Sequence, residues 1–126
     1  MVGPPRPRVL LVDDEPLVAK AMARLLAPDH DVTIVASVDA ALEHVRAGSS
    51  YEVILCDLAM PRRSSADLYE ELCVCAPELA ERMVVVTGGP TTGAARAFIE
   101  RVALPRLDKP FTPEQLFEAV ARVAAR

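Results

Sequence analysis

Short apolar runs alternate with segments of helical periodicity along most of the chain. Continuously apolar runs of four or five residues are typical of strands that are covered on both faces in a parallel sheet. Apolar positions spaced three and four residues apart are typical of helices with one buried side. We therefore expect strands at 9–12, 31–36, 53–56, 83–86 and 106–108, and helices at 16–27, 38–47, 65–75, 92–102 and from 112 onward.

Local signals support the ends of these elements. Pro16 suits the first turn of a helix, and Gly48 suits a helix end. Thr112, Pro113 and Gln115 form a capping-box pattern before the last apolar segment. Strands that alternate with helices make a parallel sheet with helices on both faces. The fold class that we predict is α/β, a doubly wound five-stranded parallel sheet with five helices.

Composition agrees with one domain and excludes several functions. The 126 residues carry a net charge of −4 and no basic run, which argues against nucleic acid binding. The three cysteines lack zinc-site spacing, and no apolar run is long enough to cross a bilayer. Residues 1–7 are rich in proline and lack a signal-peptide core, so we expect a flexible leader, a domain at 8–126 and a cytoplasmic location.

Polar residues follow the predicted strands at their carboxyl ends. Asp13 and Asp14 follow the first strand, Asp57 the third, Thr87 the fourth, and Lys109 the fifth. Ligands of doubly wound sheets bind beyond this edge. Each residue alone has a simpler explanation: an aspartate pair or a threonine can cap a helix, an aspartate can form a turn, and a lysine can be a solvated surface charge.

Together these residues predict a site for phosphoryl transfer. Three carboxylates at one edge repel each other unless a cation or a proton relieves them. Oxygen ligands without nitrogen or sulfur suit Mg²⁺, which also binds phosphate oxygens. The Thr87 hydroxyl and the Lys109 ammonium can contact a transferred phosphoryl group, and Gly88 and Gly89 let backbone amides approach it closely.

Four segments resemble the receiver domain of two-component response regulators, which has a flavodoxin-like fold. They are VLLVDDEP (9–16), VILCDLAMP (53–61), VVVTGG (84–89) and LDKPF (107–111), in matching order and spacing. The resemblance implies that Asp57 is the phosphoacceptor, that Asp14 binds Mg²⁺ directly, and that Asp13 acts mainly through a coordinated water. The Ala59 carbonyl is then a further metal ligand.

The resemblance also implies a switch. Thr87 is the hydroxyl drawn toward the phosphoryl group, Lys109 pairs with its oxygens, and the Lys109–Pro110 peptide bond is cis. This motion reshapes the surface formed by the helix at 92–102, the strand at 106–108 and the last helix. The implied partner is a histidine kinase or a histidine phosphotransfer protein, and the domain's own chemistry is limited to phosphoryl transfer to itself and slow autodephosphorylation.

Two positions depart from the family pattern. Arg106 stands where an aromatic residue is common, so an aromatic-gated switch is not expected. Ser65 stands where a glycine is usual, and we expect an ordinary turn there. The stretch from Thr87 to Phe111 looks most like receivers fused to hybrid sensor histidine kinases, although a free-standing regulator explains the same residues.

Two other functions stay open from the sequence. One is a receiver-like module that binds a protein partner without being phosphorylated. The other is an enzyme or a flavin-binding protein on the same sheet, which the lack of a glycine-rich loop after the first strand argues against. An aspartyl phosphatase is also disfavoured because Asp13 and Asp14 are adjacent instead of two residues apart.

Overall fold

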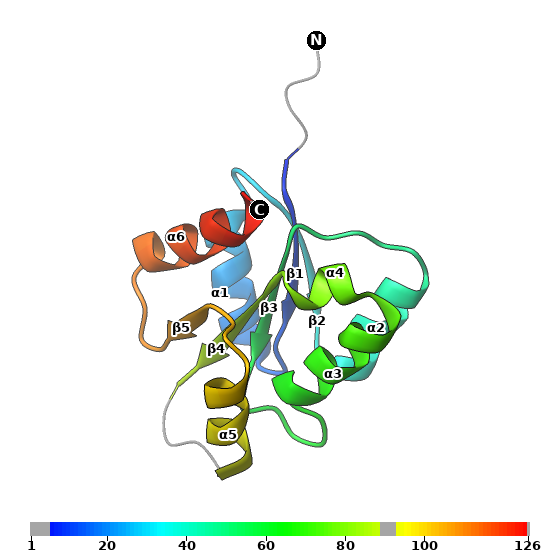
Figure 1. Ribbon diagram of the computed structural model, residues 1–126. Coiled ribbons are helices and arrows are strands. Elements are labelled where there is room, and N and C mark those ends of the chain that lie inside the picture. Colours follow the sequence, from blue (N-terminus) through cyan, green and yellow to red (C-terminus); the bar gives the residue numbers. More distant parts are fainter. Residues whose placement is uncertain (1–5, 89–92, 126) are drawn as a thin grey trace.

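The computed structural model describes residues 6–88 and 93–125, and these residues form five strands and six helices (Figure 1). The strands are β1 (Arg8–Val12), β2 (Asp31–Val35), β3 (Val53–Asp57), β4 (Met83–Thr87) and β5 (Arg106–Asp108). The helices are α1 (Pro16–Leu26), α2 (Val38–Arg46), α3 (Ser65–Cys75), α4 (Pro77–Ala80), α5 (Gly93–Arg101) and α6 (Pro113–Ala124).

The sheet is parallel throughout the described residues, in the order β2-β1-β3-β4-β5. The doubly wound topology predicted from the sequence is therefore confirmed. The strand order reverses direction between β1 and β3, and at such a switch point the loops beyond the strand ends diverge and leave room for a ligand. The carboxyl ends of β1 and β3 therefore define the place to look for a site.

Alternate residues of the buried strands pack on opposite faces of the sheet. In β1, Val9 and Leu11 join a core cluster with α1 and α6, whereas Leu10 and Val12 join a cluster with α2 and α3. This alternation follows from the pleat of a strand and explains why the central strands are apolar at every position. Figure 1 shows α1 and α6 together on one side of the sheet and α2, α3 and α4 on the other.

Helix α5 is fastened more weakly than its neighbours. Among its residues Phe98 is buried, whereas α6 buries Leu116, Val120 and Val123. Phe98 packs in a small cluster with Leu58 and Val85, beside Tyr69 of α3, whose ring centre lies 5.8 Å from that of Phe98 in an edge-to-face arrangement. One aromatic anchor therefore holds much of α5 to the sheet.

The sequence pattern missed α4. This helix is a single turn that begins at Pro77, and its four residues are too few to show a helical period.

Residues 1–5 of the expected leader and the expected helix start at residue 92 lie outside the described residues. Of the leader's last two residues, the Pro7 carbonyl accepts a hydrogen bond from the Asp31 amide at 2.9 Å, and the Arg6 guanidinium donates to the Ala27 and His30 carbonyls. No helix of the described part of the chain combines the length and apolarity needed to cross a membrane.

Candidate functional site: an acidic pocket at the carboxyl ends of the strands

The ends of β1 and β3 bring the predicted carboxylates together. Val12 pairs with Cys56 in the parallel register, so the residues that follow them, Asp13 and Asp57, lie side by side. Asp13, Asp14, Glu15 and Asp57 each place one carboxylate oxygen within 4.8 Å of the others. Asp13 and Asp57 are 3% and 5% exposed, so water screens their repulsion only weakly.

Two donors hold the Asp57 carboxylate. The Ala59 amide donates to Oδ1 at 3.0 Å, and the Lys109 ammonium lies 3.4 Å from Oδ2. The first contact comes from the loop that follows Asp57 itself, and the second comes from the end of β5, 52 residues further along the chain. A carboxylate with one oxygen on an amide and the other on an ammonium has a defined orientation, which a nucleophile needs.

Burial and the crowding of carboxylates make it less favourable for Asp13 to ionise. Burial raises the pKa of Asp13 above its ordinary value, and the charge of Asp57 raises it further. A hydrogen bond from the Glu15 amide to Asp13 Oδ1, at 2.9 Å, and the Lys109 charge offset part of this rise. Because the pKa of Asp13 is raised on balance, the hydrogen bond and the Lys109 charge compensate the buried negative charge of Asp13 only in part.

Residues at the carboxyl ends of β4 and β5 form the rest of the site beside the acidic cluster. Thr87 is buried, and its carbonyl accepts a hydrogen bond from the Lys109 amide at 2.7 Å. Gly88 lies against the stem of Lys109, because a Cβ atom at Gly88 would come within 2.9 Å of Lys109 Cδ. The Lys109–Pro110 peptide bond is cis. Gly89 lies outside the described residues.

The chemistry of the donor set fits Mg²⁺. Four carboxylates face one ammonium, so the pocket has an excess of negative charge that a divalent cation would relieve. All of the clustered donors are hard oxygens, which favour Mg²⁺ over zinc. Asp13, Asp14 and Asp57 were expected as ligands from the sequence. Glu15 was not, because next to a helix start it suggests a favourable interaction with the helix dipole.

The start of α3, which follows the loop after Asp57, contains a second residue whose position the sequence did not reveal. Ser65 is fully buried, and its hydroxyl donates to the Asp57 carbonyl at 2.8 Å and lies 3.3 Å from the Cys56 carbonyl. The backbone position with positive φ in this loop is Arg62, at 69°. The loop therefore returns to the end of β3, which a simple turn would not do.

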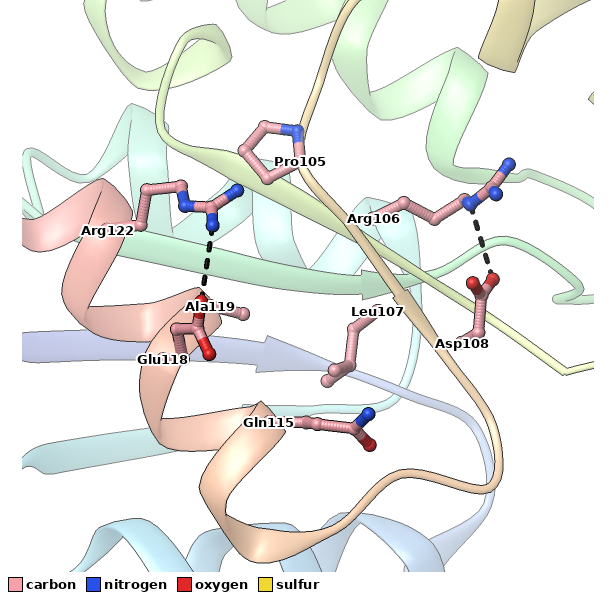
Figure 2. A pocket seen from close by; sticks show the side chains of 8 residues that line it. All are labelled: Pro105, Arg106, Leu107, Asp108, Gln115, Glu118, Ala119 and Arg122. Atoms are coloured by element: carbon pink, nitrogen blue, oxygen red, sulfur yellow. Dashed lines mark hydrogen bonds and ion pairs between the residues drawn. The ribbon is translucent and has the colours of Figure 1, made fainter.

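Arg106 lies at the edge of the sheet, outside the acidic pocket. Figure 2 shows its side chain and that of Asp108 on one side of β5, with Leu107 pointing to the other side, toward α6. Arg106 Nε lies 3.2 Å from Asp108 Oδ1, and both side chains are about half exposed or more. The cleft drawn in Figure 2 is lined further by Gln115, Glu118 and Arg122 of α6.

Comparison with known proteins agrees with this geometry. Residues 9–121 match the family described as response regulator receiver domain. The chain is 29% identical over 119 residues to a nitrate/nitrite response regulator protein homolog of Haemophilus influenzae, covering 93% of this chain and 56% of the relative. It is 31% identical over 121 residues to protein-glutamate methylesterase/protein-glutamine glutaminase 2 of Anaeromyxobacter dehalogenans, covering 94% of this chain and 35% of the relative.

A solved structure gives the same result. A putative response regulator from Chloroflexus aurantiacus superposes with a TM-score of 0.82 at 25% identity, covering 97% of this chain and all of that one. The chain belongs to the response regulator receiver domain family, whose members are typically non-enzymatic phosphoacceptor modules that partner with histidine kinases. Its acidic pocket with Lys109 is consistent with phosphoacceptor signalling. The chain spans about half and one third of the lengths of the two curated relatives.

Proposed function

We propose that residues 8–126 form a receiver domain in which Asp57 accepts a phosphoryl group from a phosphohistidine. The observation that carries this proposal is the pair of contacts on the Asp57 carboxylate, with Ala59 on one oxygen and Lys109 on the other, inside a cluster of acids. The donor is a histidine kinase or a histidine phosphotransfer protein. The domain itself does no more than take up the group and lose it slowly to water.

The transfer needs a nucleophile that is already aligned. One Asp57 oxygen forms a bond to phosphorus as the bond from phosphorus to the histidine nitrogen breaks, and the nitrogen keeps the electron pair. Lys109 neutralises charge on the phosphoryl oxygens, and the Thr87 hydroxyl donates a hydrogen bond to one of them. Asp13, Asp14, Asp57 and the Ala59 carbonyl would hold Mg²⁺, which offsets the charge of the carboxylates and of the phosphoryl oxygens.

Phosphorylation changes the surface formed by α5, β5 and α6, and the partner protein recognises this surface. A phosphoryl group on Asp57 adds negative charge and three acceptor oxygens, which draw Thr87 and its loop inward and shift α5. Arg106 belongs to this surface, but we assign it no gating role in the switch, because its guanidinium is paired with Asp108 on the exposed edge. A changed rate of dephosphorylation in the Arg106→Tyr variant would contradict that assignment.

The wider setting is also a proposal. We propose that the domain works in the cytoplasm, where histidine kinases transfer their phosphoryl groups, either fused to a kinase core, as in hybrid sensor kinases, or as a free-standing regulator. A second candidate is a receiver-like module that binds a partner without phosphorylation. The acidic cluster beside Lys109 favours the first function, because a purely structural module gains nothing from four carboxylates within 4.8 Å.

Labelling with a small phosphodonor separates the two functions. The protein is incubated with Mg²⁺ and acetyl phosphate, and the intact mass is measured. We expect one phosphoryl group on the wild type, none on Asp57→Ala, and one on Asp29→Ala, a control in which an exposed aspartate outside the pocket is removed. An unlabelled wild type favours the interaction module, and labelling that persists in Asp57→Ala shows that another residue is the acceptor.

A further inference from the structure

Ser65 is a buried polar residue that the proposed chemistry leaves unexplained. It is the first residue of α3, and its side chain is fully shielded from solvent. Its hydroxyl could have bonded to the free amides of its own helix start, as serines at helix ends commonly do. It instead points back to the sheet, to the carbonyls of Cys56 and Asp57.

These contacts join two parts of the site. Asp57 ends β3, and the following loop provides both the Ala59 amide on Asp57 Oδ1 and the start of α3. The Ser65 hydroxyl closes this loop onto the residue from which it departs, at a distance of 2.8 Å. The peptide group that follows Asp57 is also held from the β4 side, because the Leu58 amide donates to the Val86 carbonyl of β4 at 2.8 Å. The main chain around Asp57 is therefore held from both directions.

The surroundings make the hydroxyl hard to replace. In the part of the chain that the structure describes, the other side-chain donor near this oxygen is the Cys56 thiol, at 3.7 Å, and burial raises the pKa of Cys56 to about 12. A neutral thiol is a weak donor. Without the Ser65 hydroxyl, a buried carbonyl at the phosphoacceptor would lose its better partner, and such a group tends to move toward another donor or toward water.

We propose that Ser65 is a positioning residue for the phosphoacceptor: its hydroxyl fixes the main chain of Asp57 and thereby aims the carboxylate at the incoming phosphoryl group. This inference rests on the proposed function of Asp57. Ser65 touches neither the carboxylate nor a substrate, so it acts through Asp57 and through the loop that contains Ala59.

The test compares two adjacent serines of one helix start. Ser65→Ala removes the contact with β3. Ser64→Ala is the matched control, because Ser64 contacts Asp67 within α3, through its amide at 2.8 Å and its hydroxyl at 3.4 Å. Ser64→Ala weakens the start of α3 and leaves the contact with β3 in place, and in the described residues only Ser65 donates its hydroxyl to the carbonyl of Asp57. Ser65→Cys keeps a weaker donor of similar shape.

Two readouts are needed. The first is the rate constant of labelling by acetyl phosphate at saturating Mg²⁺; we expect about a tenfold decrease for Ser65→Ala, an intermediate value for Ser65→Cys, and a change of less than about twofold for Ser64→Ala. The second is the hydrogen exchange of the Ala59 amide in the metal-free protein, followed by NMR. It should accelerate in Ser65→Ala and stay unchanged in Ser64→Ala.

The outcomes distinguish this inference from the function on which it rests. If the wild type is not labelled, the phosphoacceptor proposal fails, and the Ala59 amide still reports whether Ser65 orients the Asp57 carboxylate. If Ser65→Ala is folded, is labelled at the wild-type rate and leaves the Ala59 amide unchanged, Ser65 has no positioning role. If Ser65→Ala does not fold, Ser65→Cys decides by the same two readouts, and wild-type behaviour of that variant overturns the inference.

Discussion

At the scale of single residues, Asp13 shows what the acidic pocket costs the folded protein. Its carboxylate is almost completely buried, lies in the cluster with Asp57 and has a raised pKa, chiefly because of burial. A raised pKa in the folded state means that ionising Asp13 is less favourable there than in the unfolded chain. Functional sites commonly accept such losses because binding a cation or a substrate recovers them.

We expect the Asp13→Asn variant to be more stable than the wild type in EDTA at neutral pH, by about 0.5–2 kcal/mol. The amide keeps the shape of the side chain and removes the buried negative charge. Urea unfolding monitored by circular dichroism measures the difference. Asp29→Ala is the control, because it removes an exposed negative charge outside the cluster and should change stability by less than about 0.5 kcal/mol.

The sign of the pH dependence follows from the direction of the shift. The folded protein binds the Asp13 proton more tightly than the unfolded chain, so the contribution of Asp13 to stability falls as pH rises above about 3.9, the ordinary aspartate pKa. The advantage of Asp13→Asn should therefore be small near pH 3 and grow until the raised folded pKa is passed. A difference independent of pH, or an asparagine variant that is less stable in EDTA, would contradict the prediction.

The residues of the pocket were predictable to different degrees. Asp13 and Lys109 directly follow strands, Asp57 and Thr87 end strands, and the parallel sheet by itself brings strand ends to one edge. Ser65 was not predictable in this way. Its sequence position at the start of a helix indicates a turn or a helix end, whereas its contact with Asp57 depends on the path of the loop, which the hydrophobic pattern does not encode.

At the scale of elements, α5 is the helix that the proposed switch moves, and it is also the one with the fewest buried residues among the longer helices of the described chain. Its buried residue is Phe98, which packs on Leu58 beside the phosphoacceptor and on Val85 of β4. Elements with few buried contacts open at a lower free energy than the rest of a domain. The helix therefore has the loose attachment that a switch requires.

Phe98→Ala should loosen α5 more than it loosens the rest of the protein. Removing a buried aromatic side chain costs about 3–5 kcal/mol, and each 1.4 kcal/mol is a factor of about ten in an opening equilibrium. We expect amide exchange in α5 to accelerate at least about tenfold, with a smaller change in α1 and α6. Native-state hydrogen exchange read out by NMR measures this directly.

Arg106→Ala is the control for this experiment. Arg106 is about half exposed and pairs with Asp108, and exposed ion pairs contribute at most about 1 kcal/mol. Its removal should leave exchange in α5 unchanged. Equal acceleration in all helices of Phe98→Ala would mean that α5 opens only when the whole domain unfolds, which would argue against a local switch.

The elements themselves were largely predictable, because the periods of strands and helices differ and the caps are explicit. The Thr112 hydroxyl accepts a hydrogen bond from the Gln115 amide, as the capping-box pattern predicts. The pattern overlooked α4, which is a single turn of four residues and too short to show a repeated spacing of apolar residues. Sequence periodicity thus identifies elements that bury a stripe of side chains and misses single turns between them.

At the scale of the whole molecule, the site joins three strands that are far apart in sequence. Asp13 follows β1, Asp57 ends β3 and Lys109 follows β5, so a bound cation and phosphoryl group would contact the two ends of the chain and its middle at once. A ligand that binds only the folded arrangement stabilises all of it by mass action. Occupancy of the pocket should therefore be measurable as global stability.

We expect Mg²⁺ with beryllium fluoride, a phosphoryl mimic, to raise the thermal unfolding midpoint of the wild type. At a hundred times the dissociation constant, the gain is about 2.7 kcal/mol. For a domain of this size, that is an increase of about 10 °C. Differential scanning calorimetry with Mg²⁺ alone, with beryllium fluoride alone and with both separates the two contributions, and both together should exceed their sum because each ligand neutralises charge that opposes the other.

The variants make this prediction specific to the pocket. Asp57→Ala should lose the response to the combination, since it lacks the oxygen to which the mimic attaches. Asp13→Asn, which starts more stable in EDTA, should gain less from Mg²⁺, so that the order of stability of Asp13→Asn and wild type reverses when both ligands are present. A reversal would show that the negative charge of Asp13, which destabilises the metal-free protein, is the charge that binds the cation. An equal gain in all three proteins would place the ligand elsewhere on the molecule.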